Sequence, residues 1–228
     1  PFVPSETIIE WAMKGKGELA SKDLTGFADS VSADTPVPGG GSVSALAGAL
    51  GASLAAMVAN LTVGKATSTE DKEGMGLMAL EAQALGGELM ELVDQDTEAF
   101  ASVLKAMRLP KISHAEQELR ASALEKANIL AASVPLRVSE LCVRSMRLCL
   151  DAYAKGNPSS FADALVGSLL SFAGFHGAVL NVKVNLKSIR DGDFVARTKD
   201  SLTGLGARVE SLEKEMSRLV EKADSPQG

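Results

Sequence analysis

The sequence predicts an all-α fold, a bundle of about five long helices, because apolar residues recur at helical spacing through most of the chain. No stretch alternates apolar and polar residues in the way of a half-buried strand. Of the 228 residues, 46% are hydrophobic, which is enough for a sizeable core. We expect residues 23–228 to form one helical domain and residues 1–22 to be a linker or tail segment.

Composition argues against several classes of function. With 23 basic and 29 acidic residues the net charge is −6, and no basic stripe is visible, so nucleic acid is not an expected partner. Cys142 and Cys149 lie in an apolar segment and are expected to be buried thiols in a reducing, cytoplasmic compartment. His114 and His176 are the two histidines, and without a CxxC or HExxH motif we expect no metal site. No signal peptide is recognisable.

One short helix is expected at Leu24–Ser32, and the segment Thr35–Asn60 then organises the chain. Two prolines stiffen its start, and three glycines follow that give the backbone freedom: Gly39, Gly40 and Gly41. Ser42 is expected to cap the next helix through its side chain. A bare helix N-terminus of this kind favours a ligand carboxylate or phosphate. The alternative is a tight turn before a core helix.

The helix expected over 43–64 contains no charged residue and is made mostly of small ones. Its length permits a membrane span, but large apolar residues are sparse, polar residues interrupt it and no basic cluster flanks it. We therefore expect no membrane and place this helix at the centre of a bundle. Faces of small residues allow close approach between helices, and we expect them to be buried against a second copy in a homodimer.

A long helix is expected from about Glu73 to Leu109, and one residue on it stands out. Asp96 fills a gap in an apolar stripe formed by Leu85, Leu89, Leu92, Phe100, Val103 and Met107. Asp94 is expected on the wet face instead. A carboxylate on an apolar stripe either pairs with a cation or a cap, or faces a cleft with a raised pKa.

The second half of the chain predicts three more helical stretches. Pro135 should break or kink the one over 114–153, and a final amphipathic helix over 195–222 is expected to serve packing only. Between them, one helix face combines small and polar residues: Asp163, Gly167, Leu170, Gly174, Ala178, Asn181 and Asn185. Such a face fits either a tight helix contact with internal hydrogen bonds or a polar site.

Four stretches, taken together, resemble the cyclodeaminase/cyclohydrolase family of folate enzymes. They are TPVPGGGSVSALAGALGASLAAMVANLT, LVDQDTEAFASVLKAMRLPK, the GN and AD of GNPSSFADA, and LNVKVNLKSIRD. The resemblance implies an all-helical homodimer with a folate site in a cleft near the subunit contact. It identifies Asp96, the second aspartate of the VDQDTEAF motif, with the family's catalytic residue. It also implies substrate-binding roles for Gly39, Gly40, Gly41, Ser42, Asn157, Asp163, Asn181 and Asn185. We further expect Lys111, in the loop after the long helix, to bind the glutamate carboxylates of the substrate together with the glycine-rich helix start.

Two activities occur in this family, and the shared motifs do not separate them. One is an ammonia-lyase that closes 5-formimino-tetrahydrofolate to 5,10-methenyl-tetrahydrofolate, and the other a cyclohydrolase that converts the methenyl compound to 10-formyl-tetrahydrofolate. The N-terminal PFVPSETIIEWA resembles the end of formiminotransferase domains, which favours cyclodeaminase and a fused or nearby formiminotransferase partner. A polyglutamylated folate would be the substrate, with no cofactor. A non-enzymatic helical interaction module is the remaining alternative.

Overall fold

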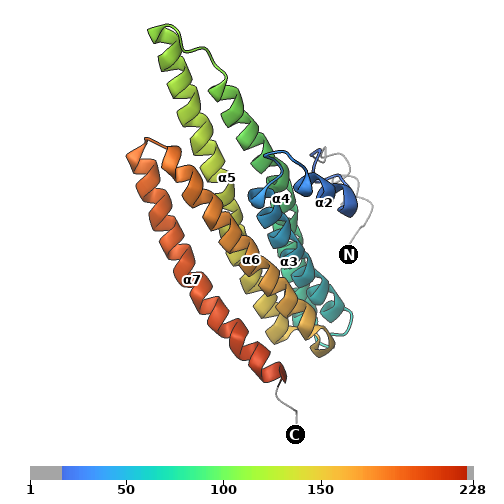
Figure 1. Ribbon diagram of the computed structural model, residues 1–228. Helices are drawn as coiled ribbons and strands as arrows, with labels where there is room; N and C mark the ends of the chain where they lie inside the picture. The colour runs from blue at the N-terminus through green and yellow to red at the C-terminus, as the bar shows by residue number, and fades with distance from the viewer. Residues whose placement is uncertain (1–16, 225–228) are drawn as a thin grey trace.

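The computed structural model describes residues 17–224, which form a helical bundle without strands. Figure 1 shows the helices in chain order, and the bounds are α2 Leu24–Ser32, α3 Gly40–Val63, α4 Thr69–Met107, α5 His114–Lys155, α6 Phe161–Asn185 and α7 Gly192–Asp224, with short 3₁₀ turns η1 Pro158–Ser160 and η2 Leu186–Ser188. These residues thus hold six α-helices instead of about five. The sequence also predicts a brief helix that begins at Ser5, a position that lies outside the described residues.

The central helix is α3, which packs on α4, α5 and α6. Its small residues serve contacts within the chain: a Cβ added to Gly51 would overlap Ser171 and approach the Gly167 carbonyl, and one on Gly174 would lie 2.7 Å from the Ser44 carbonyl oxygen. The expectation that small-residue faces form a dimer contact is therefore wrong for these glycines. They are glycine because two helix backbones approach closely.

Length and composition would also allow α3 and the segment Pro158–Ser188 to cross a membrane. In the structure the two segments pack on each other and on α5, as core helices of a bundle do. Cys142 and Cys149 lie in this core as free thiols, and burial raises the pKa of each to about 12. The prediction of buried, unbridged cysteines is confirmed.

Helix α5 runs through Pro135 without a break, so of the expected break or kink the break is excluded. A proline at position 135 has no N–H to donate to the carbonyl of residue 131. That carbonyl, on Ala131, instead accepts a hydrogen bond from Asn185 Nδ2 at 2.6 Å. A side chain from α6 thus replaces the missing backbone donor, so the helix continues through the proline.

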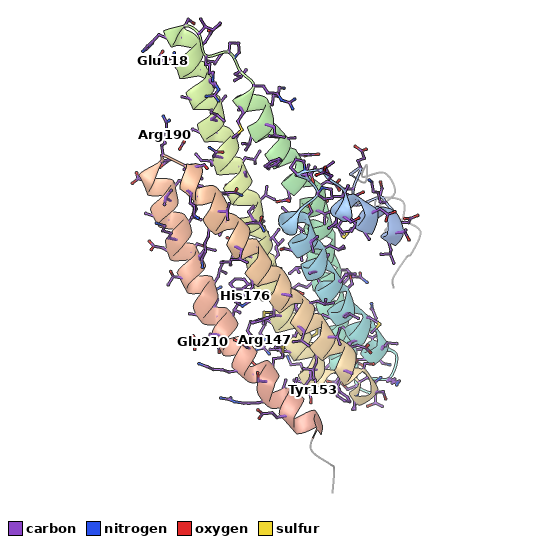
Figure 2. All side chains as sticks on the ribbon, viewed as in Figure 1. Glu118, Arg147, Tyr153, His176, Arg190 and Glu210 are labelled. Carbon is purple, nitrogen blue, oxygen red and sulfur yellow. The ribbon has the colours of Figure 1, made fainter. Side chains whose placement is uncertain are left out.

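The last helix, α7, runs along the outside of the bundle (Figure 1). Leu205, Val209, Leu212 and Met216 join the hydrophobic core, in agreement with the predicted packing role. Arg147 on α5 fixes the lower half of α7 through two hydrogen bonds to Glu215, at 2.8 and 3.0 Å (Figure 2). Further up, α6 and α7 leave a groove between them, which is described below.

Candidate functional site

Asp96 meets the N-terminus of α3 in the structure. The Ser42 hydroxyl donates to Asp96 Oδ2 at 3.0 Å and lies 3.4 Å from the Thr97 hydroxyl. Ser42 is fully buried, whereas Asp96 is half-buried. Because helix N-termini favour negative charge, the positive end of α3 stabilises the ionised form of this carboxyl group. The sequence predicted that the glycine-rich start of this helix would attract the anionic group of a ligand. In the structure the carboxyl group of Asp96 lies there.

Gly41 makes this approach possible. A Cβ at position 41 would overlap the Asp96 carboxylate. No glycine among the described residues has a positive φ, so no left-handed backbone requires the glycines at the start of α3. The requirement at Gly41 is space for the carboxylate.

Burial raises the pKa of Asp96 above its ordinary value, and the hydrogen bonds from Ser42 lower it by less. No lysine, arginine or histidine within residues 17–224 forms an ion pair with this carboxylate. Of the alternatives set by the sequence, pairing with a cation is therefore excluded among these residues. A half-buried acid whose pKa is raised above the ordinary aspartate value is a candidate general acid or base.

Asn181 is the second predicted residue at this end of the bundle. Its Nδ2 donates to the Gly177 carbonyl at 2.9 Å and lies 3.5 Å from where a Cβ on Gly40 would be. The first turn of α3 is thus flanked by Asp96 from α4 and Asn181 from α6. The fold brings Gly40, Gly41, Ser42, Asp96 and Asn181 together.

Asp94 and Asn185 bond to backbone groups, and Ser42 is not the helix cap that the sequence predicted. Asp94 is not on the wet face: its carboxylate accepts from the backbone N–H groups of Leu19 at 2.7 Å and Ala20 at 3.1 Å, and so caps the turn before α2. Ser42 is not the helix cap, because α3 begins after Gly39 without a side-chain cap. Asn185, as described above, bonds to the Ala131 carbonyl.

Three predicted residues lie far from Asp96 within one chain. Asn157 donates its backbone N–H to the Thr62 hydroxyl at 2.8 Å, at the opposite end of α3. With a rise of about 1.5 Å per residue, the 20 residues from Ser42 to Thr62 span about 30 Å. Asp163 lies in the first turn of α6, at the same distant end as Asn157. Lys111 lies in the loop after α4, which rises about 16 Å from Asp96 to Met107.

Sequence reasoning missed Thr97 and assigned Ser42 the wrong partner. The signal for Thr97 is its place directly after Asp96 in VDQDT, next to a carboxylate that needs hydroxyl donors. No local pattern links Ser42 to Asp96, since the two residues are 54 positions apart.

Comparisons with known proteins identify the family of this chain. The family model for formiminotransferase-cyclodeaminase matches residues 23–204. A formimidoyltransferase-cyclodeaminase from Mus musculus is 35% identical over 90% of this chain, and a methenyltetrahydrofolate cyclohydrolase from Methylorubrum extorquens is 34% identical over 85%. The chain spans 38% of the mouse protein's length and 93% of the bacterial one's.

A solved structure extends the match to three dimensions. The crystal structure of formiminotetrahydrofolate cyclodeaminase from Thermotoga maritima superposes with a TM-score of 0.80 at 29% identity, covering 90% of this chain and 99% of that one. Family model, curated relatives and fold agree over most of the described residues. The chain therefore belongs to the formiminotransferase-cyclodeaminase family, whose members act as cyclodeaminases or cyclohydrolases in folate metabolism.

Proposed function

We propose that this protein is a cyclodeaminase that closes 5-formimino-tetrahydrofolate to 5,10-methenyl-tetrahydrofolate and releases ammonia, with Asp96 as general acid and base. The observation that carries the proposal is the Asp96 carboxyl group, desolvated and held by the Ser42 hydroxyl without a cationic partner within residues 17–224. Such a group titrates closer to neutral pH than an exposed aspartate, which suits proton transfer in both directions.

The chemistry balances with one carboxylate. N10 attacks the carbon of the protonated formimino group on N5, and Asp96 takes the N10 proton. The tetrahedral carbon then holds N5, N10 and an amino group. Asp96 returns its proton to that amino group, the C–N bond breaks, ammonia leaves, and the methenyl cation remains. We assign to Asn181, which lies beside the first turn of α3, the binding of the folate ring system through its carboxamide. Holding N10 against the formimino carbon would supply much of the rate.

Methenyltetrahydrofolate cyclohydrolase is the second candidate activity. The Methylorubrum extorquens protein of that name matches this chain over 93% of the relative's length. There Asp96 would take a proton from the water that attacks the methenyl carbon and return it to N5 as the C–N5 bond breaks. The hydroxyl on that carbon would lose its proton to solvent and become the formyl oxygen on N10. The cyclodeaminase reading gains support from the N-terminal PFVPSETIIEWA, which resembles the end of formiminotransferase domains. The match to the formimidoyltransferase-cyclodeaminase of Gallus gallus covers 99% of this chain and therefore reaches into this segment.

The test of the reaction is a pair of assays on one preparation. Ammonia release from 5-formimino-tetrahydrofolate is measured beside the loss of methenyl absorbance during hydrolysis of 5,10-methenyl-tetrahydrofolate. We expect the first turnover number to exceed the second. The reverse order would assign the protein to the cyclohydrolases, and no turnover with either substrate would favour the interaction module.

We also propose a homodimer, formed by an apolar face along α3 and α6. Both helices leave large apolar side chains exposed although they pack on each other: Val43, Leu50, Met57 and Leu61 on α3, and Val166, Leu169, Leu180 and Val184 on α6. On α3 three of them recur every seven residues, so they form a continuous stripe. Exposed apolar stripes of this length mark interaction sites, and a self-complementary stripe suits a second copy.

A two-fold axis across the middle of this face makes the two copies antiparallel. The end of one copy that carries Asn157 and Asp163 then lies opposite the Asp96 end of the other. Asp163 forms no hydrogen bond or ion pair within residues 17–224, so its carboxylate is free for a ligand. This arrangement would unite, between two chains, predicted site residues that one chain keeps about 30 Å apart.

Mixing inactive variants tests the shared site. Asp96→Asn and Asp163→Asn are each expected to be inactive, and after subunit exchange half of the dimers are mixed, with one intact site in two. About one quarter of wild-type activity should return. No recovery, in a mixture shown by mass spectrometry to contain mixed dimers, would place the whole site in one chain.

A further inference from the structure

A groove of about 740 Å³ separates the upper parts of α6 and α7, on the side of α6 away from α3. Its apolar floor and walls are formed by Phe175 and Val179 of α6, Leu186 of η2, and Val195 and Leu202 of α7. Its volume lies in the range of small-molecule sites. This groove does not include Asp96 or any residue bonded to it.

The charges along the groove have one sign. Lys183, Lys187 and Lys199 line it, and none of them forms an ion pair within the part of the chain that the structure describes. The acidic residue of α6 is Asp163, at the other end of that helix. Three lysines without an ion-pair partner among the described residues surround an apolar floor, and their charge complements an anion.

The other end of the groove is aromatic. His176 contacts the rings of Phe172 and Phe175, with centroids 4.4 and 5.1 Å apart, and it lies where α6 faces α7 (Figure 2). The groove therefore presents an aromatic surface at one end and lysine side chains at the other. A ligand with an apolar, flat body and a negative terminus matches both ends.

Gly206 on α7 lines the groove and leaves it open at this position. A Cβ added there meets nothing within 4 Å, so no close helix contact requires a glycine. A glycine inside a helix costs about 1 kcal/mol relative to alanine. Gly206 lines the groove, whereas Gly204, equally free of contacts, is exposed and is not among the lining residues.

We propose that the α6–α7 groove binds an amphipathic organic anion, with its apolar body against Phe175 and Val179 and its carboxylate or phosphate between Lys183, Lys187 and Lys199. The ligand enters from solvent along the length of the groove. Lysine stems cover apolar surface while their ammonium groups stay at the rim, so the site attracts the charged end without burying a lysine. This site is independent of Asp96.

The probe is 8-anilinonaphthalene-1-sulfonate, an aromatic body with one negative group, followed by fluorescence at physiological salt. We expect one site per chain and an affinity about tenfold weaker in Lys183→Gln/Lys199→Gln. The control pair Lys72→Gln/Lys126→Gln removes the same charge elsewhere and should bind as wild type. The uncharged analogue N-phenyl-1-naphthylamine should not distinguish the two pairs. Equal weakening of the sulfonate in both pairs would overturn the proposal.

A second measurement tests the space. Gly206→Leu should abolish binding of both dyes, and Gly204→Leu and Asp96→Asn should leave it unchanged; equal effects of the two leucines would contradict the groove as the site. Displacement of the sulfonate by dodecanoate or by 5-formyl-tetrahydrofolate then separates a lipid-type acid from a folate. Displacement by neither compound at millimolar concentration would overturn an amphipathic anion as the ligand.

Discussion

The two ends of α3 carry polar residues of similar kinds but use them differently. At the N-terminal end, Asp96 keeps a carboxyl group with a hydroxyl partner and a raised pKa. At the C-terminal end, Asn157 accepts from the Ser159 N–H at 3.3 Å and donates its own N–H to Thr62, so it caps a turn. Polar groups that satisfy each other hold the fold, whereas a partly desolvated carboxyl group without a cationic partner among residues 17–224 is available for chemistry.

The largest effect should come from Asp96→Asn, which keeps the shape and removes proton transfer. We expect turnover to fall by about 10²- to 10⁴-fold, as for loss of a general acid or base. Because burial raises the folded-state pKa of Asp96, ionisation costs stability as pH rises above the unfolded-state value.

The asparagine variant should therefore have the higher Tm at pH 8, and the gap should shrink as the pH falls toward the ordinary pKa of aspartate. Turnover and thermal melts across pH measure both effects. Wild-type turnover in the folded variant would remove Asp96 from the mechanism.

Two glycine substitutions separate site from framework. Gly41→Ala places a Cβ against the Asp96 carboxylate, the end of a side chain that can rotate away, so activity should fall at least about tenfold with little loss of stability. Gly174→Ala places one against the Ser44 backbone, which cannot move alone, and should cost about 1–3 kcal/mol. Turnover and urea unfolding are measured for both variants. Equal losses of stability in Gly41→Ala and Gly174→Ala would contradict the assignment of Gly41 to the site and Gly174 to the helix contact.

Asn185 tests whether a predicted ligand residue is structural. Asn185→Ala leaves the Ala131 carbonyl without a donor and should lower the free energy of unfolding by about 1–3 kcal/mol. In a Pro135→Ala background the N–H of residue 135 can serve that carbonyl, so the same substitution should cost less. A double-mutant cycle by urea unfolding measures the coupling. If kcat/KM instead falls equally in both backgrounds, Asn185 contacts the substrate.

Ser42→Ala should move a pH profile without abolishing activity. The hydrogen bonds from Ser42 lower the pKa of Asp96, so their loss should raise it further. The acidic limb of the kcat/KM profile, where Asp96 must be ionised to accept the N10 proton, should shift to higher pH. An unmoved limb would assign that titration to another group.

The smallest effect is expected at the other end of α3. Asn157→Ala removes a cap and should lower the free energy of unfolding by about 1 kcal/mol. Because its amide is engaged locally, KM for the folate substrate should stay within about twofold. A KM that rises well beyond twofold in Asn157→Ala would contradict this expectation and would add Asn157 to the substrate site together with Asp163.

Helical periodicity was enough to place most elements, since it depends on residues three and four apart. The predicted helix at Leu24–Ser32 is confirmed, and so is the apolar stripe that places Asp96 among Leu89, Leu92 and Val103, all buried. Local spacing could not predict that the helix continues through Pro135, because the donor that replaces the missing backbone N–H is Asn185, 50 positions further along the chain. Nor could it predict the place of Asp94, because its partners at Leu19 and Ala20 lie 75 and 74 positions away.

By itself the sequence determined the helical class, the family and the aspartate that interrupts an apolar face. These follow from local spacing and from motifs that are contiguous in the chain. Only the tertiary structure decided that the small-residue faces of α3 and α6 meet within one chain, that Asp96 faces Ser42 and the first turn of α3, and that Asn185 serves Ala131. Each of these contacts joins segments that are far apart in the sequence. Which polar groups then find a partner depends on how those segments pack, and no local pattern in the chain records that.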